Sequence, residues 1–163
     1  ILVLSDSHSG MRFMRQCVET IKPQAVVHLG DYYDDGETLK ELYPHIELHQ
    51  VPGNCDHYRC PPWVHAVLCY DVCGVRLFMT HGHKHGVKTN TAMLIAEARA
   101  KKAQAALYGH THVAECYREE SGMWVMNPGS SGYGGGSAGL IEAENNEICS
   151  CRIITPENLE EFV

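Results

Sequence analysis

Short apolar runs that end in polar turns organise the first third of the chain. Residues 1–5 and 25–29 are apolar runs of strand length, and each leads directly into polar residues. Between them, apolar side chains in residues 10–21 recur at helical spacing, which predicts a helix. Residues 37–43 predict a second, short helix and residues 46–51 a third strand. This alternation of strand and helix is typical of a parallel sheet covered by helices.

The pattern becomes mostly strand-like in the second half. Residues 66–72 and 75–80 predict a hairpin, and the Ala-rich segment 89–103 predicts a helix. Further strand-like runs follow, mostly joined by turn sequences: residues 105–108, 113–118, 123–127, 138–143 and 148–154. We expect these later runs to form an antiparallel meander of hairpins. One α/β (α+β) domain over residues 1–163, with a mixed sheet or two packed sheets and outer helices, accommodates both halves.

The length, charge and hydropathy of the chain argue against several classes of protein. The length of 163 residues suits one domain, since domains usually have about 100–200 residues. A net charge of −7 argues against binding to nucleic-acid duplexes, which requires surplus basic charge. No apolar run approaches the roughly 18 residues of a membrane span, and the opening residues lack the basic segment of a signal peptide. We therefore expect a cytoplasmic protein with no membrane partner.

Cysteine and histidine are both frequent. None of the 8 cysteines is spaced as Cys-x-x-Cys, and we expect buried, reduced thiols, including those in strand-like runs: Cys69, Cys73, Cys149 and Cys151. Histidine is the commonest metal ligand, and several of the 11 histidines cluster in residues 81–85 and 110–112. His45, His49 and His65 lie outside these clusters and are expected to be solvated surface residues.

Polar clusters with ligand-type side chains fall where the predicted strands end. They are Asp6-Ser7-His8, Gly30-Asp31, Gly53-Asn54-Cys55-Asp56, His81-Gly82-His83 and Gly109-His110-Thr111-His112. Each fragment alone is compatible with an ordinary turn. Together they indicate a site, because the carboxyl ends of strands form the usual ligand crevice of an open α/β sheet.

In this order the motifs resemble those of the calcineurin-like metallophosphoesterases, and their spacing is most similar to the small YfcE-type phosphodiesterases of bacteria and archaea. The resemblance runs from Asp6 to about Ser131. It implies a two-layer β-sandwich of mixed sheets flanked by helices, with a two-metal centre at one edge. One metal would be held by Asp6, His8 and His112. The other would be held by Asn54, His81 and His110, with Asp31 bridging both.

This ligand set favours phosphoester hydrolysis. Two divalent ions carry more positive charge than two carboxylates return, so the centre attracts a phosphate despite the acidic chain. Metals about 3.5–4 Å apart lower the pKa of a shared water, which yields a hydroxide able to attack phosphorus. Nitrogen and oxygen ligands without thiolate suit transition metals, and we expect manganese ahead of iron, zinc, cobalt or nickel.

We therefore expect a metal-dependent phosphodiesterase acting on a small phosphoester, with Asp31, Asn54 and His83 in catalytic roles. A phosphomonoesterase of the same fold is one alternative, and a non-catalytic scaffold such as the retromer subunit that shares this fold is another. Cys55 occupies the position at which phosphoprotein phosphatases of the superfamily have the histidine assigned as general acid. We expect Cys55 to be structural, with His57 the next candidate acid. The sequence leaves oligomerisation open.

Overall fold

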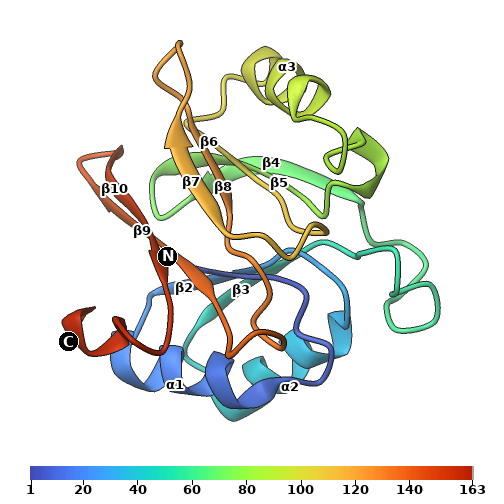
Figure 1. The fold of residues 1–163 in the computed structure, drawn as a ribbon, viewed down its shortest axis with the longest axis vertical. Helices are drawn as coiled ribbons and strands as arrows, with labels where there is room; N and C mark the ends of the chain where they lie inside the picture. The colour runs from blue at the N-terminus through green and yellow to red at the C-terminus, as the bar shows by residue number, and fades with distance from the viewer. Residues whose placement is uncertain (163) are drawn as a thin grey trace.

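The computed structural model describes residues 1–162 as two five-stranded sheets stacked face to face, with helices on the outer sides (Figure 1). The first sheet has the order β10-β9-β1-β2-β3, formed by β1 (Leu2–Leu4), β2 (Ala25–His28), β3 (Glu47–Gln50), β9 (Ala138–Glu144) and β10 (Glu147–Ile154). The second has the order β4-β5-β6-β8-β7, formed by β4 (Val67–Val72), β5 (Val75–Thr80), β6 (Ala105–Leu107), β7 (Glu115–Arg118) and β8 (Trp124–Asn127). The helical elements are α1 (Met11–Ile21), α2 (Tyr33–Leu42), α3 (Ala92–Ala100) and the 3₁₀ turns η1 (His83–His85) and η2 (Leu159–Phe162).

Side-chain alternation along the strands generates three apolar layers. Val3 of β1 points into the layer between the sheets, whereas Leu2 and Leu4 pack against α1 and α2 on the other face. Similarly, Leu77 of β5 lies between the sheets and Phe78 packs beneath α3. Because successive strand residues face opposite sides, each sheet can bury both of its faces. The predicted two-layer sandwich with flanking helices is confirmed.

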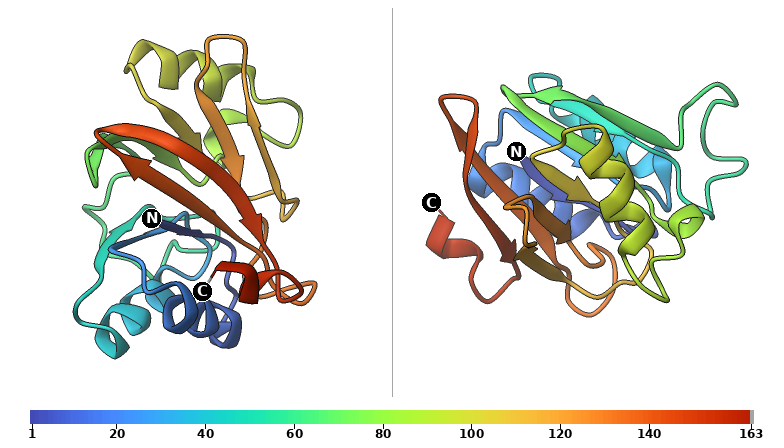
Figure 2. Two further views of the ribbon diagram at one scale, coloured as in Figure 1. Left: turned by 90° about the vertical axis from the view of Figure 1, so that its left-hand side faces the viewer. Right: turned by 90° about the horizontal axis from the view of Figure 1, so that it is seen from above.

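The antiparallel hairpins β7–β8 and β9–β10 are present, but the prediction that the later strands form one antiparallel meander is wrong. β6 pairs in parallel with both β5 and β8, and the β9–β10 hairpin joins the first sheet, where β9 pairs with β1. The hairpin is red-orange in the left panel of Figure 2, where it passes between the two outer helical layers. All three residues of β6 are buried, so this strand is covered on both faces, as is usual for strands in parallel pairing. Turn signals alone did not reveal which strand each run pairs with.

Several local expectations also need correction. α2 begins at Tyr33 rather than residue 37, because its first turn carries Asp34 and Asp35, which suit a helix N-terminus but add no apolar periodicity. α3 is shorter than the predicted segment 89–103, because residues 89–91 precede the helix and residues 101–102 form a turn after it. No helix within residues 1–162 has the length and apolarity needed to span a membrane.

Two kinds of side chain were misplaced by sequence reasoning. Cys73 lies in the β4–β5 turn and Cys149 on an edge strand, and both are exposed rather than buried. His49 is only 9% exposed, since β3 turns it towards β4, where its Nδ1 lies 2.9 Å from the Tyr70 hydroxyl. It is therefore not a solvated surface residue, unlike His45 and His65.

A buried carboxylate fastens two of the loops that leave the first sheet. Asp56 is fully buried, and its Oδ1 accepts the backbone N–H groups of Tyr32 (2.7 Å) and Tyr33 (2.8 Å). Its Oδ2 accepts those of Asp31 (2.9 Å) and Gly53 (2.6 Å). These charge-assisted hydrogen bonds hold the turn after β2 against the loop after β3, and they fix the backbone at Asp31.

We predict that Asp56→Ala lowers the free energy of unfolding of the metal-free protein by about 3 kcal/mol, because it leaves several buried N–H groups without an acceptor. Urea denaturation followed by circular dichroism measures this. The matched control is Asp71→Ala, which removes an exposed carboxylate paired with Arg76 and should cost less than about 1 kcal/mol. Equal losses for the two variants would contradict the role assigned to Asp56.

Candidate metal centre

The loops that follow five strands bring all of the sequence-predicted ligands to one edge of the sandwich. Asp6 and His8 follow β1, Asp31 follows β2, and Asn54 lies in the loop after β3. From the second sheet, His81 follows β5, and both His110 and His112 follow β6. The site is therefore assembled from both sheets, and each cluster described below includes residues from both.

The first cluster consists of Asp6, His8, Asp31 and His112. One ligand atom from each residue lies within 4.8 Å of the others. His112 Nε2 is 3.1 Å from Asp6 Oδ1, and His8 Nε2 is 3.7 Å from Asp31 Oδ2. Asp6 Oδ1 and His8 Nε2 are buried without a hydrogen-bond partner. Leaving such groups unsatisfied is costly, so this arrangement fits a bound cation.

The second cluster centres on His81, which is fully buried. Its Nε2 lies 3.1 Å from Asn54 Oδ1, 3.2 Å from His110 Nδ1 and 3.5 Å from Asp31 Oδ1. Its Nδ1 is 2.8 Å from the Leu29 carbonyl oxygen, which only accepts hydrogen bonds, so this nitrogen carries the proton. In the neutral ring Nε2 then presents a lone pair to the amide and carboxylate oxygens, an arrangement that suits metal coordination.

Asp31 belongs to both clusters through its two oxygens. Oδ2 faces His8, whereas Oδ1 faces His81 and accepts the backbone N–H of Cys55 at 2.9 Å. Burial raises the pKa of Asp31, but His81, hydrogen bonding from Cys55 and His8 outweigh it, and the pKa lies below its usual value. The side chain is therefore a carboxylate at neutral pH.

The backbone at the site is held in an unusual conformation. Five of the predicted ligands have positive φ angles: Asp6 (52°), His8 (44°), Asp31 (56°), His110 (69°) and His112 (60°). This left-handed region is uncommon for residues other than glycine, and such strain concentrates at functional sites. The surrounding hydrogen bonds must therefore stabilise these loops.

Other residues around the clusters support the loops that carry the ligands, and among them Asp35 was not identified from the sequence. Asp35 accepts hydrogen bonds from Ser7 Oγ (2.7 Å) and the Ser9 N–H (2.8 Å), which fixes the loop carrying Asp6 and His8. Ser130 Oγ donates to the Asp6 carbonyl at 2.7 Å. Asp35 lies in the first turn of α2, where an acid is ordinary, so its sequence position carried no signal of this role.

His83 lies beside the second cluster rather than within it. Its ring centroid is 5.4 Å from that of His81 and 6.0 Å from that of His110. Its Nδ1 is buried without a hydrogen-bond partner. Burial, followed by the charges of His81, His110 and Lys84, lowers the pKa of His83, so the imidazole is neutral at pH 7.

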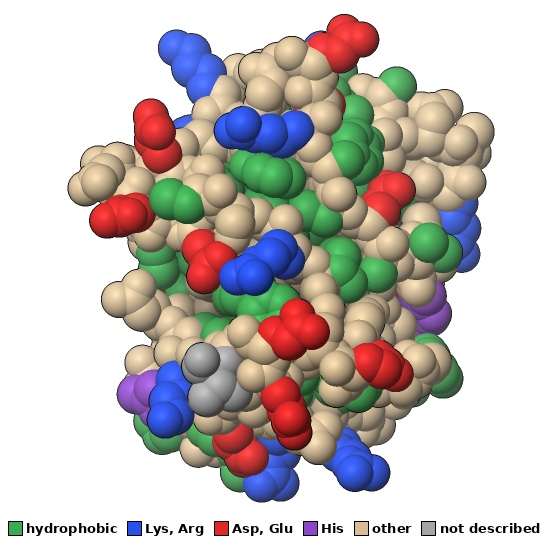
Figure 3. Space-filling view, turned by 60° about the vertical axis from the view of Figure 1, so that its left-hand side comes forward, with side chains coloured by type: hydrophobic (Ala, Val, Ile, Leu, Met, Phe, Trp, Pro, Cys, Tyr) green, Lys and Arg blue, Asp and Glu red, His purple; other side chains and the backbone are tan. Residues whose placement is uncertain are grey.

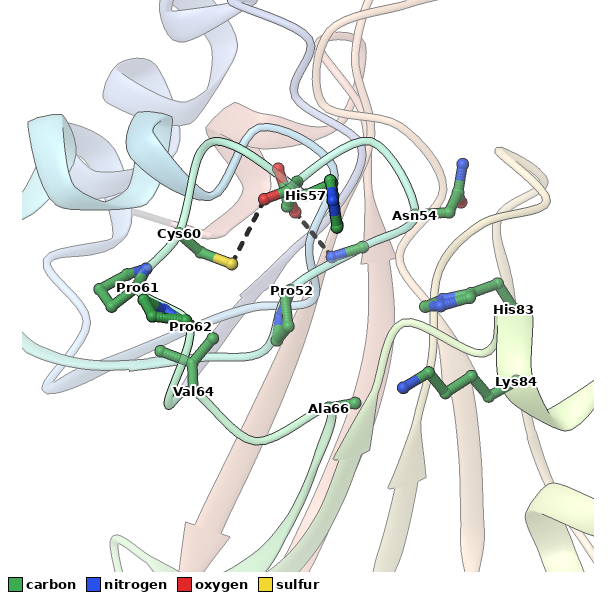
Figure 4. A pocket seen from close by; sticks show the side chains of 12 residues that line it. Pro52, Asn54, His57, Cys60, Pro61, Pro62, Val64, Ala66, His83 and Lys84 are labelled. Carbon is green, nitrogen blue, oxygen red and sulfur yellow. Dashed lines mark hydrogen bonds between the residues drawn. The ribbon is translucent and has the colours of Figure 1, made fainter.

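A cavity adjoins each cluster. The larger, of about 490 Å³, reaches Asn54 and His83, as Figure 4 shows. The smaller, of about 270 Å³, reaches His112 and Tyr133. The Tyr133 ring stacks on His112 at 5.6 Å between centroids, so the glycine-rich segment 132–136 forms one rim of the centre.

The thiol next to Asn54 is poorly suited to giving up a proton. Partial burial and the neighbouring Asp31 carboxylate raise the pKa of Cys55 to about 11. Its backbone N–H already serves the site by donating to Asp31. This geometry favours a structural part for Cys55, as expected from the sequence.

The curated relatives with similar sequences are probable metallophosphoesterases. The chain is 30% identical over 135 residues to the probable metallophosphoesterase YsnB of Bacillus subtilis, covering 80% of the chain and 73% of that protein. It is 28% identical over 133 residues to a probable metallophosphoesterase of Mycoplasma pneumoniae, covering 80% and 77% respectively.

Solved structures show the same fold. A predicted phosphoesterase from Streptococcus pneumoniae superposes with a TM-score of 0.72 at 23% identity, covering 94% of this chain and 95% of that one. Vps29 of Entamoeba histolytica, in complex with Zn²⁺, gives a TM-score of 0.68 at 20% identity over 94% and 97% of the two chains. Residues 1–145 match the model of the calcineurin-like phosphoesterase superfamily domain. This match and the identity to the YsnB protein show that the chain belongs to the calcineurin-like phosphoesterase superfamily.

Proposed function

We propose that the protein is a two-metal phosphodiesterase. The observation that carries the proposal is the position of His81 Nε2, which lies 3.1 Å from Asn54 Oδ1 and 3.5 Å from Asp31 Oδ1 while the opposite ring nitrogen is hydrogen-bonded to the Leu29 carbonyl. Electron-pair donors directed at one another repel, and a cation between them removes the repulsion. The unpartnered Asp6 and His8 atoms support a second cation in the first cluster.

The chemistry of the donor set supports transition-metal ions, with manganese the expected one. Asp6, His8 and His112 would hold one ion, Asn54, His81 and His110 the other, and Asp31 would contact both. Divalent ions in such a pair lower the pKa of water and polarise phosphoryl oxygens.

The chain's own groups complete the site. The lowered pKa of Asp31 keeps a negative charge between the clusters, which opposes the repulsion between two cations. His83 is neutral and borders the larger cavity, so its ring can donate a hydrogen bond to a phosphoryl oxygen as negative charge develops there. Burial around His81 and Asp31 excludes water, which strengthens these interactions.

The two cavities favour a diester over a monoester. The larger shares Asn54 with the second cluster, and the smaller shares His112 with the first. A phosphorus placed between the clusters therefore has a cavity on each side. A phosphodiester has an organic group for each of these spaces, whereas a monoester occupies only one.

A scaffold role is the second candidate, since the fold is shared with Vps29. Tyr58 (93% exposed) and Trp63 (77% exposed) are large apolar side chains on the surface, as expected of a binding surface. In contrast, the face towards β9 and β10 in Figure 3 has small apolar areas interrupted by acidic and basic groups. The complete ligand set, together with a cavity beside each cluster, favours the enzyme.

We predict that the protein reconstituted with Mn²⁺ binds two ions per chain. We also predict that Asp31→Asn loses at least one of them and roughly 100-fold or more in kcat/KM, because Asp31 presents one carboxylate oxygen to each cluster. Elemental analysis and turnover of bis(p-nitrophenyl) phosphate measure the two effects. Asp34→Asn is the matched control, since this nearby carboxylate pairs with Arg59 instead. Full metal content and activity in Asp31→Asn would overturn the bridging assignment.

We predict a higher kcat/KM for bis(p-nitrophenyl) phosphate than for p-nitrophenyl phosphate, by about tenfold or more, because only the diester fills both cavities. Both rates come from the same colorimetric assay.

Chelation should abolish both activities while the circular dichroism spectrum persists, since the apolar layers do not depend on the ions. A preference for the monoester would favour a phosphomonoesterase, and no turnover with any transition metal would favour the scaffold.

We predict that Cys55→Ser retains its metals and most of its activity towards both aryl and alkyl diesters, because a thiol with a pKa near 11 is a poor general acid at neutral pH. His83→Ala, the companion variant, should retain its metals but lower kcat. Steady-state kinetics with metal analysis of each variant provides the check. Selective loss of alkyl-ester turnover in Cys55→Ser would instead identify Cys55 as the acid.

A further inference from the structure

The larger cavity combines apolar walls with a single lysine. Its lining residues are Pro52, Gly53, Asn54, Asp56, His57, Cys60, Pro61, Pro62, Val64, Ala66, His83 and Lys84. In Figure 4 the Lys84 side chain extends from η1 across the cavity towards Ala66, below the His83 ring. Its ammonium group therefore lies at the cavity, one residue from a side chain that borders the second cluster.

Lys84 has no charged partner within the described part of the chain. The salt bridges there engage other groups, such as Arg59 with Asp34 and Lys101 with Glu97. Other basic side chains, such as Lys22 and Lys102, also lie outside these salt bridges, but Lys84 is the one lysine or arginine among the residues that line the cavity. The cavity thus has a positive charge available to an anionic ligand.

The turn that carries Lys84 is firmly anchored. His85 is buried, its Nε2 lies 2.9 Å from Glu97 Oε2 on α3, and its ring packs edge-on against Phe78 at 5.8 Å. Gly82 and Gly86 bracket the turn with φ angles of 99° and 65°. Successive residues of a 3₁₀ turn point about 120° apart. Because His85 is fixed inwards, His83 and Lys84 are directed to the cavity side.

We propose that Lys84 determines substrate specificity by binding a second phosphate group, on the part of a phosphodiester that occupies the larger cavity. This inference rests on the proposed phosphodiesterase function and names the substrate class for it. A lysine is a point charge suited to phosphate, and the proline-rich wall offers an apolar surface for a flat ring. A cavity of about 490 Å³ lies within the range of ligand sites of about 300–1,000 Å³.

The substrate class that fits these features is a linear dinucleotide with a terminal 5′-phosphate. The nucleoside ring would lie against Pro52, Pro61 and Pro62, the terminal phosphate would pair with Lys84, and the internal phosphodiester would face the clusters. Hydrolysis adds water across one P–O ester bond, so pApA yields two molecules of AMP and ApA yields adenosine and AMP.

The test compares pApA with ApA in the Mn²⁺-loaded protein, by KM and by equilibrium binding measured with calorimetry. The wild-type protein should show a KM for pApA about fivefold lower than for ApA, as expected for a partly exposed charge pair. Lys84→Ala should abolish this preference, and Lys84→Arg should restore part of it. Lys88→Ala is the matched control, because it removes the same charge from a nearby exposed lysine outside the cavity and should leave the preference intact.

Failure of the inference is distinguishable from failure of the proposed function. Turnover of both dinucleotides with no preference for pApA, or with a preference that persists in Lys84→Ala, would overturn the role of Lys84 and leave the phosphodiesterase standing. Absence of turnover, together with binding of pApA that weakens in Lys84→Ala but not in Lys88→Ala, would support the anion site and refute the phosphodiesterase. Absence of both turnover and binding would overturn both.

Discussion

The close approach of electron-pair donors from His81, Asp31 and Asn54 is the constraint on which this edge of the sandwich depends. His81 Nε2 lies 3.5 Å from Asp31 Oδ1 and 3.1 Å from Asn54 Oδ1. The Leu29 carbonyl holds the imidazole in this position through Nδ1, and Asp56 holds the turn at Asp31 by accepting the backbone N–H groups of Asp31 and Tyr32. The fold thus holds these donor atoms close together, and buried hydrogen bonds offset the free-energy cost of doing so.

The sandwich could be predicted from the family that the strand-end motifs resemble, and the structure brings the residues of these motifs together. Such motifs can be found in a sequence because they depend on local order along the chain. Asp6-Ser7-His8 and Gly109-His110-Thr111-His112 could be recognised without knowing which strand pairs with which. The parallel pairing of β1, β2 and β3 and the β4–β5 hairpin could be predicted, but the pairing of the later strands could not. The parallel neighbours of β6 and the pairing of β9 with β1 depend on contacts between residues far apart in the sequence. Turn residues indicate only local structure and do not reveal such contacts.

The supporting residues were hidden for a different reason. Asp56 and Asp35 are acids at positions where turns and helix starts commonly have them, so their burial and multiple hydrogen bonds had no counterpart in the sequence. The burial of His49 and the exposure of Cys73 could not be predicted either. His49 is covered by what packs against its strand, and Cys73 lies in the β4–β5 turn rather than within a strand. Motifs identify the chemistry of a position, whereas packing decides how that position is held.

Each cluster draws its members from both sheets, and this has a mechanical consequence. Asp6 and His8 leave the first sheet while His112 leaves the second, and Asn54 and His81 are divided in the same way. An ion in either cluster would therefore link loops from the two sheets at this edge of the sandwich. It would oppose any sliding or opening of one sheet relative to the other. By mass action, each tenfold increase in the free-ion concentration above the dissociation constant would add about 1.4 kcal/mol to the stability of the closed sandwich. The rigidity of this edge would therefore depend on the supply of metal.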